Sequence, residues 1–300
     1  MILVICLYIL IASSFTFAKA ALFYSEPLFY LGVRMVLAGS LLLAYCKIRG
    51  INLAIRREDY WHFLSIILFH IYISFALDLI ALQFMTSFKA AFIFNLSPFI
   101  SALFSYYYFS EVMTGRKWLG LGIGLLGFLP ELITNISREN IMGNASFISW
   151  PEIMMIGSVI TASFGWVIVR ILTKKNYSPL MINGVGMFGG GILAFVTSLL
   201  FETWHPFPVT EWGLFFRYLL LTIIVANVLF YNLYSYLLRF YTATFLAFAG
   251  FLAPLFAALF GWLLLNEKVD FTFFFSLIVV TIGLVVFYYE ELRQGYIKRS

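Results

Sequence analysis

PFISALFSYYYFSE, residues 98–111, and PLFAALFGWLLLNE, residues 254–267, are two versions of one pattern. Each is an apolar run that opens on a proline and ends on a glutamate. Five residues of the first stretch recur 156 positions later, and Gly127 recurs as Gly283 at the same offset. Leu and Phe match easily by chance in an apolar chain, whereas a gap-free spacing of Pro, Glu and Gly does not. The chain is therefore expected to contain two related halves.

The composition excludes a water-soluble domain. The 300 residues are 63% hydrophobic and 11% charged, and the mean hydropathy is +0.97. A soluble domain carries roughly 25% charged residues, so this surface suits lipid rather than water. The net charge of +5 comes from basic residues between apolar runs, which form no stripe for nucleic acid. We therefore expect a lipid bilayer as a partner and no nucleic acid.

The apolar runs are long enough to be transmembrane helices, which need about 20 mostly apolar residues and at least roughly 17. The first run lacks the basic start of a signal peptide, so it counts as a span. The predicted fold class is an all-helical membrane protein of ten transmembrane helices. The ten segments are about 2–19, 28–46, 61–83, 88–109, 118–134, 152–172, 180–200, 214–237, 243–265 and 271–289.

The distribution of lysine and arginine predicts the orientation, because positive charge is retained in the cytoplasm. If the N-terminus is cytoplasmic, 13 of the 19 basic residues fall on that side and five on the other, with Arg34 inside a span. Both termini are therefore predicted to be cytoplasmic. The predicted location is the cytoplasmic (inner) membrane, as a multi-pass protein.

The repeat is predicted to be inverted, because its offset contains five spans, an odd number. A weaker match relates the second helices of the two halves, whose matching residues are 152 positions apart. Inverted repeats are typical of secondary transporters, whose two halves expose one central site to either side in turn. The predicted domains are a first five-helix repeat over 1–150 and a second, inverted one over 151–300. In the weaker match, Pro27, Gly32, Met35, Gly39 and Leu41 recur as Pro179, Gly184, Met187, Gly191 and Leu193.

Several motif residues occur in a set order: Lys19, Pro27, Arg34, Pro98, Glu111, Gly120 and Gly127, then Tyr231, Pro254, Glu267 and Gly283. In this order the chain resembles the ten-helix EamA-type permeases of the drug/metabolite transporter superfamily, over nearly its whole length. The resemblance implies two five-helix bundles around a cavity lined mainly by helices 1, 3, 4, 6, 8 and 9. It implies alternating access and transport of small metabolites, often amino acids outward. Lys89 departs from the family, which has small or apolar residues there.

Helix 3 carries the first group of candidate binding residues. His70, Ser74 and Asp78 are four residues apart and so should share one face. Ionisable groups inside a membrane are costly and often functional, which favours a substrate or proton site with Asp78 as carboxylate and His70 as titrating partner. The alternative is a buried ion pair of Asp78 with Lys89 across the turn to helix 4, because a paired charge costs much less than a lone one.

Helix 8 supplies the second group. Asn227, Tyr231 and Tyr234 should share a face by the same spacing, with Asn95 on helix 4 and Trp166 on helix 6 as further cavity residues. The alternative is interhelical hydrogen bonding or packing. The predicted substrate-binding residues are His70, Ser74, Asp78, Lys89, Asn95, Trp166, Asn227, Tyr231 and Tyr234.

Other residues are assigned structural roles. Pro98 and Pro254 are predicted hinges beside the cavity, because proline breaks a backbone hydrogen bond and bends a helix; a static kink is the alternative. Glu111 and Glu267 end their helices at the water interface and are assigned to gating or capping contacts. Arg34 lies deeper than the other basic residues and is expected to be structural, snorkelling or pairing with a carboxylate.

Motif searches exclude several functions. The chain has no GxxxxGK[ST] phosphate loop and no CxxC or HExxH spacing, which argues against an ATP-driven pump. No cofactor, metal site or catalytic residue is predicted, and the chain is not expected to be an enzyme. A lipid-modifying membrane enzyme is the alternative from another class, but its acids would be clustered, and here they are scattered.

The predicted function is a secondary transporter that moves a small metabolite, an amino acid or related solute, by alternating access. The alternative within the class is an uptake carrier for a nucleotide-like or S-adenosylmethionine-like metabolite. The predicted partners are a small-molecule substrate, the bilayer and a candidate coupling proton, and the chain is expected to be a monomer or homodimer.

Overall fold

The computed structural model describes residues 2–84, 90, 93–94, 96–124, 126–127, 150–250, 252–253, 255–256 and 271–295. These residues form helices and turns, with one isolated bridge between Ser25 and Val209. The all-helical membrane class is confirmed. Six helices in the described ranges are long and apolar enough to cross a bilayer: Ile2–Leu22, Pro27–Ile48, Arg57–Gln83, Trp150–Lys174, Pro179–Phe201 and Trp212–Leu237.

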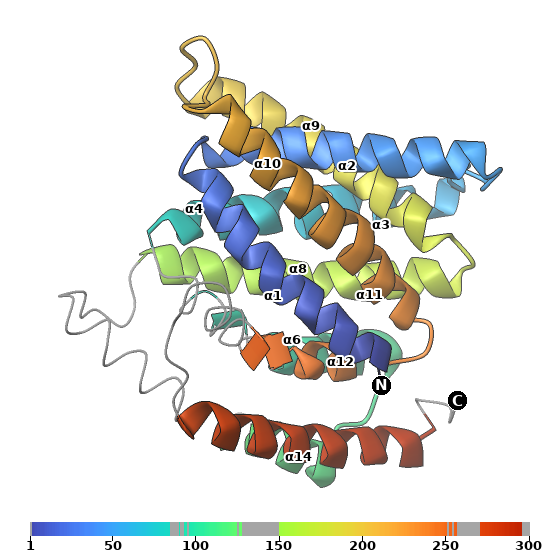
Figure 1. The fold of residues 1–300 in the computed structure, drawn as a ribbon. Helices are drawn as coiled ribbons and strands as arrows, with labels where there is room; N and C mark the ends of the chain where they lie inside the picture. The colour runs from blue at the N-terminus through green and yellow to red at the C-terminus, as the bar shows by residue number, and fades with distance from the viewer. Residues whose placement is uncertain are drawn as a thin grey trace.

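The helices pack into one bundle in which α1 and the α10–α11 helix cross in front of the others (Figure 1). The start of α1 and the end of α14 lie toward the same side of this view. The first half contains α1 (Ile2–Leu22), α2 (Pro27–Ile48), η1 (Arg57–Asp59), α3 (Tyr60–Ser65), η2 (Ile66–Ile73), α4 (Ser74–Gln83) and α6 (Ser97–Phe109). The second half contains α8 (Trp150–Lys174), α9 (Pro179–Phe201), α10 (Trp212–Thr222), η3 (Ile223–Phe230), α11 (Tyr231–Leu237), α12 (Ala243–Ala249) and α14 (Phe271–Arg293).

The glycines at the α2–α9 contact let the two helices approach closely. A Cβ added to Gly191 would lie 2.6 Å from the backbone nitrogen of Val36, and one added to Gly32 would lie 2.9 Å from the Phe195 ring. Residue numbers rise along α2 as those of their contacts on α9 fall, so the two helices are antiparallel. An offset of 152 residues converts each contact into its counterpart: Gly32 with Phe195, Gly184 with Leu43, Gly39 with Phe188, and Gly191 with Val36.

The third long helix of each half contains a π-helical segment of eight residues. These segments are η2 (Ile66–Ile73) and η3 (Ile223–Phe230), and their positions correspond at an offset of 157 residues. In a π-helix the hydrogen bonds run from residue i to i+5 rather than i+4. Residues on either side of such a segment therefore do not share a face when counted in steps of four.

Glu202 ties the loop after α9 to the start of α2. Its carboxylate accepts hydrogen bonds from the backbone N–H of Leu28 at 2.5 Å and of Phe29 at 2.8 Å, and from the Ser198 hydroxyl at 2.6 Å. An anion suits the free N–H groups at a helix start. Burial raises the pKa of Glu202, although these hydrogen bonds favour its charged form.

The opposite face of the bundle is held by buried ion pairs. Glu111 accepts from Arg170 Nη1 at 2.5 Å, and Lys117 pairs with Glu291. Glu111 follows directly on the end of α6, and its side chain is buried in this pair rather than open to water. Its role in gating or capping stays a prediction. Its predicted counterpart, Glu267, lies outside the described residues.

The fourth helix differs from its prediction as one span over 88–109. A turn at Leu96 precedes α6, and Pro98 occupies the first turn of α6, where its missing N–H costs nothing. The predicted spans over 88–109, 118–134 and 243–265 lie partly outside the described residues. Pro254 is one of the residues outside them.

Candidate functional site

A central cavity of about 150 Å³ lies between helices of both halves. The helices that the family resemblance implied, numbers 1, 3, 4, 6, 8 and 9, all contribute side chains. Helix α2 adds Arg34, which had been expected to be structural. The polar and aromatic lining residues are Tyr8, Ser14, Arg34, Ser74, Phe75, Asp78, Phe94, Ser97, Ser101, Ser158, Ser163, Trp166, Phe230, Tyr231 and Tyr234.

Arg34 and Asp78 are the charged residues among the described lining of the cavity. Arg34 Nε donates to Asn227 Oδ1 at 2.8 Å, and the guanidinium lies 5.1 Å from the centre of the Phe75 ring. Asp78 Oδ1 is buried and accepts no hydrogen bond from any described residue, Arg34 included. The cavity therefore presents one fixed cation and one carboxylate whose Oδ1 has no donor among the described residues.

A cluster of aromatic rings forms another part of the wall. Trp166 stacks on Tyr234 with ring centres 3.9 Å apart and 28° between the planes, and Tyr231 lies 4.9 Å from Trp166. The Tyr8 hydroxyl donates to the backbone carbonyl of Leu246, which links α1 to α12. Flat rings beside an open space suit a planar or cationic group of a ligand.

Serines supply most of the remaining polar lining, and the sequence predictions missed most of them. Ser74 is a predicted binding residue, and its hydroxyl lies 3.3 Å from the carbonyl of Ser158 on α8. Ser97 and Ser101 are four residues apart on α6, a spacing that was visible in the sequence. Serine is common in membrane helices as a packing residue, so its presence alone did not mark a cavity.

His70 and Asn227 do not line the cavity, although both were predicted to share a face with residues that do. Both lie inside π-helical segments, where residues four apart do not follow the α-helical spacing on which the prediction relied. His70 packs behind the aromatic wall, 4.4 Å from Trp166 and 5.5 Å from Tyr231 between ring centres. Asn227 acts from behind through its hydrogen bond to Arg34. Direct contact of either residue with substrate stays a prediction.

Two further predicted binding residues, Lys89 and Asn95, lie outside the described residues, so the proposed pairing of Asp78 with Lys89 stays a prediction. Of the predicted binding residues, the structure brings five together around the cavity. These are Ser74, Asp78, Trp166, Tyr231 and Tyr234.

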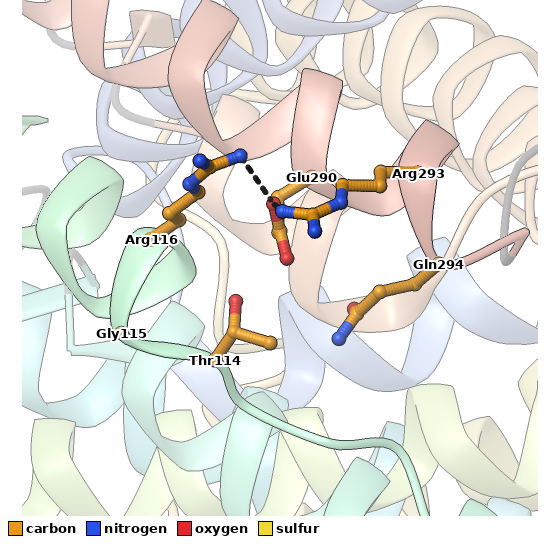
Figure 2. Close-up of a pocket in the computed structure, with 6 residues that line it drawn as sticks. All are labelled: Thr114, Gly115, Arg116, Glu290, Arg293 and Gln294. Atoms are coloured by element: carbon orange, nitrogen blue, oxygen red, sulfur yellow. Dashed lines mark ion pairs between the residues drawn. The ribbon is translucent and has the colours of Figure 1, made fainter.

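A second, wider hollow of about 590 Å³ lies at the end of the bundle, lined by Thr114, Gly115, Arg116, Glu290, Arg293 and Gln294 (Figure 2). Arg116 and Arg293 both pair with Glu290, at 3.7 Å and 3.8 Å. Both arginines are largely exposed, so water screens their charge. The described residues of its lining include no aromatic ring, and the central cavity is therefore the better candidate.

Comparison with known families identifies the fold and its general role. A model of the EamA-like transporter family matches residues 1–129 and 149–289. The chain belongs to the EamA-like transporter family. The resemblance noted in the sequence is thereby confirmed. Membership of the EamA-like family implies a membrane-embedded protein that acts on a small-molecule substrate.

Three relatives show how far the similarity extends. Proteins of Chlamydia muridarum and of Chlamydia trachomatis serovar L2 are each 34% identical over 291 residues, 96% of this chain, and the match covers 91% and 89% of their lengths. Both are named S-adenosylmethionine/S-adenosylhomocysteine transporter. The uncharacterized transporter YoaV of Bacillus subtilis is 23% identical over 272 residues, 86% of each chain.

A solved crystal structure shares the fold at low sequence identity. It covers 95% of this chain and 94% of its own, with a TM-score of 0.74 and 15% identity. At that identity the likeness shows the fold alone.

Proposed function

We propose that this EamA-like protein is a secondary transporter for S-adenosylmethionine, S-adenosylhomocysteine or a close analogue. The supporting observation is the composition of the central cavity, which combines Arg34 and Asp78 with stacked rings at Trp166 and Tyr234. The names of the two chlamydial relatives point to the same solutes. The alternative from the sequence, a S-adenosylmethionine-like solute, is thus favoured over a simple amino acid.

The chemistry of these solutes explains the preference. Each joins a purine, a ribose and a zwitterionic amino acid, and S-adenosylmethionine adds a sulfonium cation. A purine stacks on aromatic rings, and a sulfonium is attracted to their faces. A free amino acid would use the two charges but would leave the Trp166–Tyr234 stack without a matching group.

The transport mechanism in this proposal is alternating access by two inverted repeats, residues 1–150 and 151–300, in ten spans. The exchange-symmetric contacts between α2 and α9 and the paired π-helical segments support it. Ligand cavities usually measure about 300–1,000 Å³, so the cavity of about 150 Å³ must widen to admit the solute. Pro98, just after the turn at Leu96, and Pro254 are the proposed hinges.

The test is counterflow in proteoliposomes that contain the purified protein. Vesicles loaded with unlabelled S-adenosylhomocysteine should take up labelled S-adenosylmethionine in a saturable, transient overshoot. Methionine uptake without S-adenosylmethionine uptake would contradict the proposal in favour of an amino-acid carrier. Ohmic flux would indicate a channel, and covalent turnover of lipid would indicate an enzyme.

A matched pair of tryptophan variants separates the site from general damage. Trp166→Ala removes the cavity ring and should abolish most of the overshoot. Trp61→Ala removes a side chain that is 77% exposed and should leave transport unchanged. Equal transport by both variants would contradict the proposal that this cavity binds the transported solute.

A further inference from the structure

The contact between two lining serines gives a reference point from which Asp78 and Trp166 can be placed along the central cavity. Ser74 of α4 and Ser158 of α8 meet in the middle, with their hydroxyls 3.4 Å apart. The two helices run antiparallel there, so positions can be counted outward from this contact. Asp78 lies four residues from Ser74 in one direction, and Trp166 lies eight residues from Ser158 in the other.

The count gives an approximate length for the site. At 1.5 Å per residue, the Cα atoms of Asp78 and Trp166 are roughly 18 Å apart along the helices. Helical side chains tilt toward the N-terminus of their own helix, which here brings both toward the serine contact and shortens the distance between their tips. An elongated solute with different ends therefore fits the cavity better than a compact one.

Arg34 is oriented to bind a carboxylate. Its Nε is committed to Asn227 at 2.8 Å, so a carboxylate that forms two parallel hydrogen bonds would meet Nη1 and Nη2. The side chain is 3% exposed, and a charge-assisted pair in such a site is only weakly screened.

Asp78 lies at the same end of the cavity as Arg34, and its carboxylate needs a hydrogen-bond donor rather than an acceptor. Its Oδ1 is buried without a hydrogen-bond donor among the described residues, which is costly for a carboxylate. Arg34 is close enough to act on it electrostatically but does not donate to it. An ammonium group of the solute would supply the missing donors.

We propose that Arg34 and Asp78 together form an α-amino-acid subsite, in which Arg34 binds the carboxylate and Asp78 the ammonium group. The serines face the ribose, and the Trp166–Tyr234 stack binds the base. This assignment rests on the proposed function and adds the orientation of the solute. The amino-acid end lies toward the face where α2 starts, and the base lies toward the face where α8 ends.

The test uses competitors that each lack one part of the solute. Labelled S-adenosylmethionine uptake is measured against S-adenosylhomocysteine, decarboxylated S-adenosylhomocysteine and methylthioadenosine, which lacks the amino acid. In the wild type, removing the carboxylate should weaken competition about ten- to a hundredfold, the contribution of hydrogen bonds to a charged group. In Arg34→Lys, which keeps the charge but loses the planar fork, this preference should largely disappear.

Further variants identify the other subsites. Asp78→Asn should weaken competition by S-adenosylhomocysteine but not competition by methylthioadenosine. Trp166→Ala should weaken competition by both compounds and leave the carboxylate preference intact. Arg217→Lys and Glu58→Gln change exposed residues and should match the wild type. Folding of each variant is checked by its unfolding temperature, and Asp78→Asn keeps the test usable if Arg34→Lys fails to fold.

Three results would overturn the assignment, and the first two can be distinguished from the third. If the wild type takes up S-adenosylmethionine but Arg34→Lys keeps the full carboxylate preference, the subsite is wrong and the proposed function survives. The same holds if folded Asp78→Asn weakens methylthioadenosine as much as S-adenosylhomocysteine. If the wild type takes up no S-adenosylmethionine, the proposed function and the subsite both fail.

Discussion

Single residues in this protein depend on partners that the linear sequence does not reveal. Arg34 follows this rule, because Asn227 on a helix of the other half fixes its guanidinium. Asn227 also donates toward the sulfur atoms of Met35 and Met187, so it links α2, α9 and η3. Neighbouring Asn232 instead bonds to Asn183 and to its own helix backbone.

The two asparagines should therefore respond differently to substitution. Asn227→Leu removes the acceptor of Arg34 and should raise the half-saturation concentration for solute about tenfold, with a smaller effect on the maximal rate. Asn232→Leu should lower the unfolding temperature and leave half-saturation unchanged. Transport kinetics with a thermal melt of each variant check this, and equal half-saturation in both variants would contradict it.

The buried Glu111–Arg170 pair allows a second prediction at this scale. Arg170→Met leaves a buried carboxylate without its partner and should cost about 3–5 kcal/mol of unfolding free energy. The double variant with Glu111→Gln should cost less than the sum of the single changes. Glu58→Gln in the exposed Arg56–Glu58 pair is the control and should cost about 0–1 kcal/mol. Chemical unfolding in detergent is measured for the wild type, both single variants, the double variant and the control, and additive costs would argue against coupling.

The third long helix of each half is interrupted by a π-helical segment. Ser74 and Tyr231, each the first residue after a π-helical segment, line the cavity, while His70 in η2 and Asn227 in η3 do not. Such segments are rare and often occur at functional sites. Their matching positions make the π-helical segment a shared feature of the third long helix in each half.

The α2–α9 contact gives a prediction at the scale of elements. Gly191→Ala places a methyl group 2.6 Å from the backbone of Val36, which cannot move aside as a side chain would. The cost should be about 1–3 kcal/mol, as for other overpacked sites. The symmetry-related Gly39→Ala should cost a similar amount. Gly122→Ala meets nothing within 4 Å and should be neutral or slightly stabilising. Unfolding temperatures in detergent decide, and equal values for Gly191→Ala and Gly122→Ala would contradict the close contact.

The whole molecule presents two faces with different chemistry. One carries the buried pairs Glu111–Arg170 and Lys117–Glu291, and the other carries Glu202 at the start of α2. The excess of lysine and arginine predicts that the face with the ion pairs is cytoplasmic. The ion pairs connect the first and second halves of the chain at that face. In the proposed alternating-access mechanism, they separate when the cavity opens to that face.

Reporter fusions test this orientation. A fluorescent protein fused after Ser300 should fluoresce, and alkaline phosphatase at the same point should be inactive, because both termini are predicted inside. Alkaline phosphatase inserted after Phe207, in the loop after α9, should be active. The reverse pattern would invert the topology, and with it the direction in which the solute is oriented.

The amino-acid sequence by itself determined the solvent of this protein, its helical class and its family. Lipid selects for long apolar runs, so spans can be read from composition alone, and Ser74, Asp78, Trp166, Tyr231 and Tyr234 could be assigned to a cavity. Tertiary structure decided the rest. His70 and Asn227, which lie inside the two π-helical segments, do not line the cavity, and packing of α2 brings Arg34 into it. Local spacing cannot determine such placements, because which face of a helix meets a cavity depends on its neighbours.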